Sequence, residues 1–147
     1  MPESDRIEAG SYQLSADWQI ELPVDYQYRL EDGDLCLWRK GMTVWAAIWH
    51  NDYDESVRQR YLRLKNQCPR EAFDMVESSD GRHFRIGFRL ADSDDDSRFA
   101  FYGYVVSECG HVKIAMFFSD PNEIETAKAL WRSVTVVSKY AYPGVSG

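Results

Sequence analysis

Few residues in this sequence have the types and spacing that catalysis or metal binding requires. The segment Cys109-Gly110-His111 places a thiol and an imidazole near one turn, and a catalytic cysteine needs such a base to become a thiolate. The sequence supplies no third group to orient them, so we do not expect a catalytic pair. The three histidines, His50, His83 and His111, are too few and too far apart in the sequence to form a metal site by spacing. We therefore expect neither metal nor cofactor.

The acidic loop from Asp92 to Asp96 opens like a calcium-binding loop, with carboxylates at alternate positions. An EF-hand loop that starts at Asp92 needs glycine at its sixth position and glutamate at its twelfth. Ser97 and Gly103 stand at those two positions instead. We therefore interpret this segment as a solvated loop.

Aromatic and basic side chains supply the candidate binding residues. Tyr102 and Tyr104 share one face of a predicted strand, and phenols usually keep one edge in water, so they could line an aromatic groove. Arg85 and Arg89 could form a basic stripe for an anion or an acidic partner, although the acidic N-terminal third could also neutralise it. The full set of predicted binding residues is Tyr102, Tyr104, His83, Arg85, Arg89 and His111.

Two segments predict central strands, because they are apolar at both alternating sets of positions. These are Met42 to Trp49 and Phe99 to Val106, and such strands are expected to be covered on both faces of a sheet. Single-sided alternation predicts six more strands around them. Those segments begin at Trp18, Tyr26, Leu35, Phe73, Phe84 and Val112.

Two helices complete the predicted elements. Val57, Tyr61, Leu64 and Cys68 fall on one helical stripe, in a helix expected to begin near Asp54 and to end before Pro69, with Arg58, Arg60, Arg63 and Lys65 as a basic flank. Asp120 to Glu123 has an acidic N-cap, proline at the first helical position and glutamate at the third. The second helix follows, with Ile124, Ala127, Trp131 and Val134 on its buried stripe.

Runs of hairpin-connected strands with only two helices predict an α+β fold with a mainly antiparallel sheet flanked by helices. We expect one domain over residues 1–147, with an ordered core from about residue 12 to residue 136. The polar N-terminus and the C-terminal tail are expected to be loosely held.

Most of the chain, from about residue 12 to residue 136, resembles the PsbP and DcrB type of domain. The resemblance rests on the run Phe101 to Val106, on Gly110, on Asp120-Pro121 and on the helix end Ala129 to Val134, together with the order of elements. It implies an α/β/α sandwich and a non-catalytic role as an assembly factor, adaptor or chaperone. It implies no catalytic residues, and the long loops that PsbP-like proteins use in photosystem binding have no counterpart here.

Composition and charge limit the class of protein. The chain has 147 residues, 44% of them hydrophobic and 14% aromatic, as expected of a folded domain. All of the net charge of −7 comes from residues 1–35, which hold nine acids and two bases. This charge argues against nucleic acid as a partner and allows a basic protein partner.

The cysteines and the termini bear on the location of the protein. Three cysteines without a CxxC pair, no membrane-spanning apolar run and no signal sequence favour the cytoplasm.

The sequence therefore predicts a non-catalytic protein-binding or adaptor-like module that presents one face of its sheet, or its acidic N-terminal region, to a protein partner. The alternative is a small-molecule-binding protein or small enzyme, with a pocket lined by Tyr102, Tyr104 and either His83 or His111. A toxin-neutralising immunity protein is one specific form of the first hypothesis. It predicts a tight, salt-sensitive complex with a basic partner.

Overall fold

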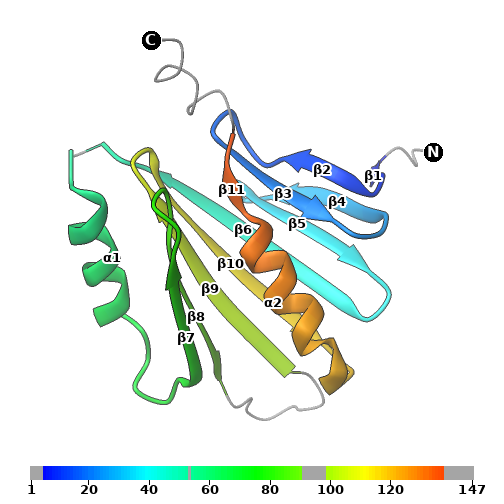
Figure 1. The fold of residues 1–147 in the computed structure, drawn as a ribbon. Coiled ribbons are helices and arrows are strands. Elements are labelled where there is room, and N and C mark those ends of the chain that lie inside the picture. The colour runs from blue at the N-terminus through cyan, green and yellow to red at the C-terminus, as the bar shows by residue number, and fades with distance from the viewer. Residues whose placement is uncertain (1–4, 53, 91–98, 138–147) are drawn as a thin grey trace.

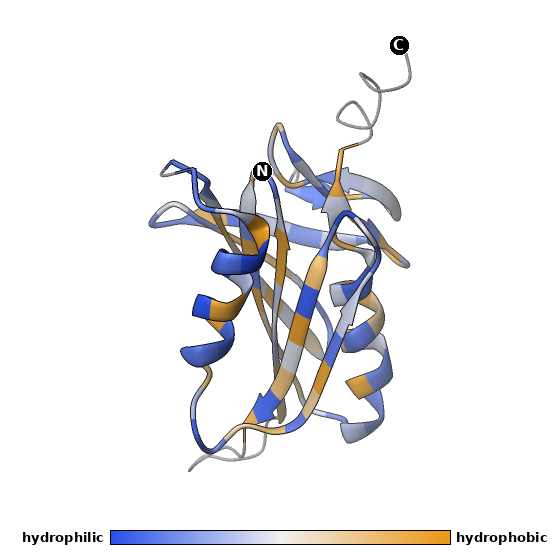
Figure 2. Cartoon of the chain, turned by 60° about the vertical axis from the view of Figure 1, so that its left-hand side comes forward, coloured by the Kyte–Doolittle hydropathy of each residue, from blue (hydrophilic) through white to orange (hydrophobic). Residues whose placement is uncertain are grey.

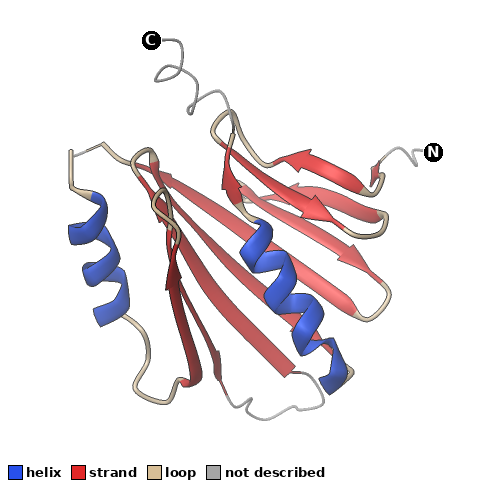
Figure 3. Cartoon of the chain, viewed as in Figure 1, coloured by secondary structure: helices blue, strands red, loops and turns tan. Residues whose placement is uncertain are grey.

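The computed structural model describes residues 5–52, 54–90 and 99–137, and strands form most of that part of the chain (Figure 1, Figure 3). The main sheet has eight strands in the order β1-β4-β5-β6-β10-β9-β8-β7, and every neighbouring pair is antiparallel. Its strands are β1 (Arg6–Ile7), β4 (Tyr26–Glu31), β5 (Asp34–Arg39), β6 (Met42–His50), β7 (Phe73–Ser79), β8 (Phe84–Leu90), β9 (Phe99–Ser107) and β10 (Gly110–Phe118).

A second, three-stranded sheet packs over one face of the main sheet. It has the order β11-β3-β2 and consists of β2 (Gly10–Gln13), β3 (Trp18–Leu22) and β11 (Thr135–Val136). The helix α2 (Ile124–Ser133), which follows the 3₁₀ turn η1 (Pro121–Glu123), lies beside this sheet and packs against β3, β9 and β10. We term the side of the main sheet that these elements cover the core face.

The opposite side of the main sheet, here termed the outer face, carries the helix α1 (Val57–Asn66). This helix packs against β8 and β9. Figure 2 shows α1 and α2 on opposite sides of the strands. The buried residues under α1 form a small cluster of their own, made of Tyr61, Leu64, Ile86 and Val106.

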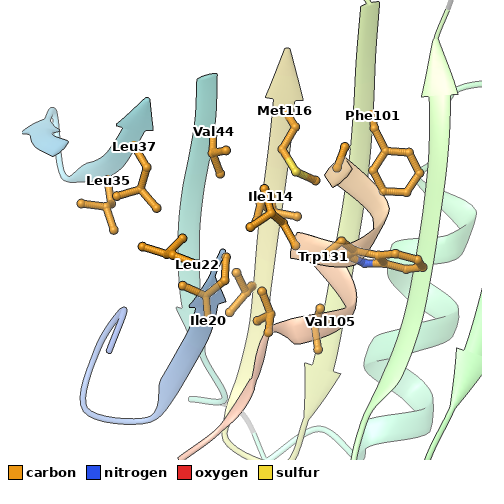
Figure 4. Packing of buried hydrophobic residues seen from close by; sticks show 14 of the residues in the cluster. Ile20, Leu22, Leu35, Leu37, Val44, Phe101, Val105, Ile114, Met116 and Trp131 are labelled. Atoms are coloured by element: carbon orange, nitrogen blue, oxygen red, sulfur yellow. The ribbon is translucent and has the colours of Figure 1, made fainter. Parts of the chain in front are cut away.

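The main hydrophobic core lies between the two sheets and α2 (Figure 4). Ile20 and Leu22 of β3 and Trp131 of α2 point toward apolar side chains of β5, β6, β9 and β10. Trp131 is fully buried and fits because Gly87 and Gly103 beneath it lack a side chain. A Cβ atom on Gly103 would lie 2.3 Å from Trp131 Cδ1, well inside van der Waals contact.

The predicted fold class, α+β with an α/β/α sandwich, is wrong. Of the described residues, 53% are in strands and 19% in helices, so the fold is β-rich. The strand β3 was expected to lie in the same sheet as its neighbours in sequence. It instead buries Trp18, Ile20 and Leu22 on its inward side and leaves Glu21 outside, the one-sided pattern of a strand in a covering sheet.

Predicted strand positions agree with the structure, whereas helix starts and chain ends differ. All eight predicted strands are present, and Asp120 caps the 3₁₀ turn before α2 by accepting a hydrogen bond from the Asn122 backbone N–H. The cap of α1 is Ser56 rather than Asp54, because Ser56 and Gln59 form a reciprocal capping box. Strand pairing begins at Arg6, earlier than the expected residue 12. The expected C-terminal tail beyond Val137 lies outside the described residues.

Candidate functional site

The outer face of the main sheet is only partly covered by the described residues. A helix of ten residues is about 15 Å long and about 10 Å wide, whereas eight strands about 4.8 Å apart span roughly 35 Å. The helix α1 can therefore cover only two or three strands, and it packs on β8 and β9. The outward side chains of β5 and of most of β6 and β10 lie beyond this cover, whereas His111 at the start of β10 is buried beneath Arg60 of α1.

Aromatic residues dominate that open part of the outer face. Alternation along the strands brings five of them to it, and all five are partly exposed, with Trp49 at 47%. Tyr102 and Phe117 meet edge to face with ring centroids 5.9 Å apart, a favourable aromatic geometry. The set, here termed the aromatic face, consists of Trp38, Trp45, Trp49, Tyr102 and Phe117.

The aromatic face has a shallow hollow and one cation above it. A hollow of about 250 Å³ lies among Trp45, Trp49 and the small side chains Ala47 and Ala115, and the charged residues Asp34 and Lys113 also line it. The Arg29 guanidinium lies 5.1 Å from the ring centroid of Trp38 and 5.9 Å from that of Trp45, so cation–π attraction helps to hold both indoles in place. The face is thus ordered before any partner arrives.

A larger cavity of about 550 Å³ lies where the aromatic face meets α1, and we term it the basic pocket. Its cations are Arg60, Arg63 and Lys113, and Asp52 is the carboxylate that lines it. Its lining residues are Trp49, His50, Asp52, Arg60, Arg63, Leu64, Gln67, Tyr104, His111 and Lys113.

A buried arginine–histidine pair forms the floor of the basic pocket. Arg60 and His111 are 4% and 5% exposed, and Arg60 Nη1 donates to His111 Nδ1 at 2.8 Å. Since a guanidinium can only donate, Nδ1 must accept, and the neutral ring carries its proton on Nε2. Burial, followed by the Arg60 charge, lowers the pKa of His111 to about 4.

The six predicted binding residues lie on opposite faces of the main sheet. Tyr102, Tyr104 and His111 are on the outer face, and the Tyr104 and His111 rings meet at 5.9 Å. His83, Arg85 and Arg89 belong to the side of β8 that faces the core, where Arg85 pairs with Val105 and Arg89 with Phe101 in the sheet register. A single pocket that combines Tyr104 with His83 is therefore not formed.

His83 and Arg85, at the start of β8, hold the segment that follows α2, including β11. The Val136 backbone N–H donates to His83 Nε2 at 3.1 Å, and Arg85 Nη2 donates to the Val134 carbonyl at 2.8 Å. Burial acts to raise the pKa of Asp80, but hydrogen bonds from Arg82, Arg85 and His83 outweigh burial and lower it. These contacts explain both residues as structural.

The acids that neutralise the basic stripe come from nearby in the sequence, and not from the N-terminal third. Asp80 pairs with Arg85 at 3.1 Å, and Asp74 lies 4.0 Å from Arg89 Nη1. Arg89 also lies over the ring of Phe73. The stripe is thus largely paired, and we do not carry it forward as a binding site.

The remaining chemical motifs find little support. Burial raises the pKa of the Cys109 thiol to about 11, so thiolate is scarce at neutral pH.

Within residues 5–52, 54–90 and 99–137, no three His, Cys, Asp or Glu side chains are placed to hold a metal ion. The calcium-like segment from Asp92 to Asp96 lies outside the described residues. No helix in the described part of the chain is long and apolar enough to cross a membrane.

Comparison with known proteins yields no relative, since no protein-family model and no curated protein matches the chain. The resemblance to PsbP and DcrB domains therefore stays a prediction.

Sequence reasoning missed Trp38 and Lys113 as site residues, named Arg60 only as part of a basic helix flank, and treated Trp45 and Trp49 mostly as core. A signal was present in β6, where one set of alternating positions carries two tryptophans while the other carries aliphatic residues. Tryptophan is common where one edge stays in water. The small number of predicted helices was a second signal, because two helices cannot cover both faces of a wide sheet.

Proposed function

We propose that this protein is a non-catalytic binding module whose aromatic face docks on an apolar segment of a protein partner. One observation carries the proposal: β6 lies at the centre of the main sheet and is apolar on both sides, yet Trp45 and Trp49 on its outer side remain partly exposed. An exposed, contiguous set of aromatic side chains usually marks an interaction surface.

The rigidity of the aromatic face favours binding. Its tryptophans stand on the strands β5 and β6, which have neighbours on both sides in the sheet. Side chains that are already ordered lose little conformational entropy on association. The hollow between Trp45 and Trp49, which Asp34 and Lys113 also line, has room for one side chain of a partner, and a filled pocket is the usual arrangement of an interface hot spot.

The shape of the aromatic face favours a protein over a small molecule. Its hollow of about 250 Å³ is shallow and lies on an otherwise continuous sheet surface, whereas small-molecule sites are concave and typically larger than about 300 Å³. We also propose that the protein is located in the cytoplasm, because its three cysteines are free thiols.

A basic partner is a weaker expectation than an apolar one. Among the acids of residues 1–35, Asp25 pairs with Arg6 at 2.6 Å and Glu31 with Arg29 at 2.9 Å. Part of the negative charge is therefore engaged within the chain. The immunity-protein hypothesis depends on that charge and stays a prediction.

The test is affinity capture from lysate of the source cells with matched variants. Trp45→Ser and Trp49→Ser should each weaken binding of the captured protein by about 30-fold, the loss of a 2 kcal/mol hot spot. Leu62→Ser removes an apolar side chain that is 44% exposed on α1 and should leave capture unchanged. Circular dichroism and urea midpoints establish that all three variants are folded.

Two results would contradict the proposal. One is capture of the same proteins by the wild type and by both tryptophan variants. The other is failure of the wild type to capture any protein whose binding depends on Trp45 or Trp49.

A further inference from the structure

The basic pocket beside the aromatic face contains more positive charge than its own acids neutralise. Arg63 donates two hydrogen bonds to Glu55, at 3.0 and 2.9 Å, and Arg60 Nε lies 3.4 Å from the same carboxylate. The single carboxylate of Glu55 therefore neutralises only one of the two positive charges of Arg60 and Arg63. Lys113, the third cation, forms no ion pair with a described residue, although Asp52 also lines the cavity.

The position of Lys113 is unusual for a charged residue. It stands on β10, a central strand, where its sheet neighbours are Ala47 and Tyr104, and it is partly buried. An unpaired ammonium group among apolar side chains is costly unless an anion neutralises it. Its place beside Tyr104 and Ala47, in a cavity with two further cations, therefore points to a bound anion.

His111 adds a neutral hydrogen-bond donor to these cations. Its Nδ1 atom accepts from Arg60, so the ring proton is on Nε2. The ring also lines the cavity. The neutral Nε2–H group can donate a hydrogen bond to an anion. Because it adds no positive charge, a ligand with a single negative charge is sufficient.

Trp49 provides a flat apolar wall. Its indole stacks on His111, with ring centroids 4.8 Å apart and an angle of 13° between the planes. Trp49 is nevertheless 47% exposed, so a planar group can stack against it. The cavity of about 550 Å³ lies within the usual range for small ligands.

From this geometry we infer that the basic pocket binds an aromatic monocarboxylate: the carboxylate lies between Lys113 and His111, and the ring lies against Trp49. A monoanion fits better than a phosphate dianion, since Glu55 already engages Arg63 and Asp52 repels a second charge. The carboxylate can belong to a free small molecule or to an acidic residue beside an aromatic one in a peptide.

The test is titration with benzoate, followed by tryptophan fluorescence and by the NMR signals of the His111 ring. Benzoate should bind at about a millimolar, the affinity expected of a nine-atom ligand. Benzamide has the same shape without the charge and should bind at least about tenfold more weakly, because a charge-assisted hydrogen bond is lost. Raising the salt concentration should also weaken benzoate binding.

Two charge-matched variants locate the site. Lys113→Gln should weaken benzoate binding by about tenfold. Lys40→Gln removes the same charge from the turn before β6, at the opposite end of that nine-residue strand and roughly 25 Å away, and should leave binding unchanged. N-acetyl-Phe-Asp-amide distinguishes the sources: tighter binding of the peptide assigns the carboxylate to a partner's acidic residue, and tighter binding of benzoate to a free ligand.

Three results would overturn this inference. These are failure of both benzoate and the peptide to bind, equal binding of benzoate and benzamide, and equal effects of Lys113→Gln and Lys40→Gln. No protein partner takes part in the titration, so docking on the aromatic face and carboxylate binding can fail independently.

Discussion

The buried pair of Arg60 and His111 makes the stability of this protein depend on pH in a specific window. The pKa of His111 falls from 6.5 in the unfolded chain to about 4 in the folded one. Burial and the charges of Arg60 and Arg63 lower it, while Glu55 opposes them. Trp49 and Tyr104, the other groups that face the ring, carry no charge at neutral pH.

The sign of the effect follows from which state binds the proton. Above pH 6.5 the His111 ring is neutral in both states, and its full contribution to stability is present. Between pH 6.5 and about 4 the unfolded chain binds a proton that the folded one does not, so stability falls as pH falls. The loss is about 1.4 kcal/mol per pH unit and about 3 kcal/mol in all.

The assay is urea unfolding from pH 7.5 to pH 4, with His111→Asn as the matched variant. The asparagine side chain can still accept from Arg60 but does not titrate, so the variant should lose about 3 kcal/mol less than the wild type over this range. Comparison with the variant cancels other titrating groups, His83 among them. Equal pH slopes in the two proteins, or an NMR titration that places the His111 pKa near 6.5, would refute the reasoning.

Three further predictions concern packing, capping and thiol chemistry. Gly103→Ala should lower the free energy of unfolding by about 2–4 kcal/mol, because its methyl group collides with Trp131; in a Trp131→Leu background a urea double-mutant cycle should show much of that cost removed. Ser56→Ala should cost about 1 kcal/mol in the same assay, since it removes the capping box with Gln59. Cys109, with a thiol pKa of about 11, should react with Ellman's reagent far more slowly in the folded protein than in urea, and its rate should rise with pH up to that value.

Local physics accounts for what could be predicted about the individual elements. The strand segments follow from alternation along the chain. Of the predicted stripe on the second helix, Ala127, Trp131 and Val134 are buried, and Ile124 is partly buried. Both signals depend on residues close together in sequence. The start of α1 was wrong because Asp54 was taken as the cap, whereas Ser56 has Gln59 three residues later as its reciprocal partner.

Contacts between distant segments decided the layers. β3 pairs with Thr135–Val136, more than a hundred residues later. The alternation of apolar and polar residues in either strand does not show which strand it pairs with. Without it, β3 was assigned to the one predicted antiparallel sheet, whereas the α/β/α sandwich was what the resemblance to PsbP and DcrB domains implied. The same limit applied to His83 and Arg85, whose partners Val134 and Val136 lie far along the chain.

The sequence by itself determined that β6 and β9 would be central strands, since apolar residues at both sets of alternating positions do not suit an edge. Only the tertiary structure decided how each face of those strands is used. The core face meets a second sheet and α2, whereas α1 covers only part of the outer face. Burial depends on which elements arrive from elsewhere in the chain, and a strand's own residues cannot show whether Trp45 and Trp49 will be core or binding surface.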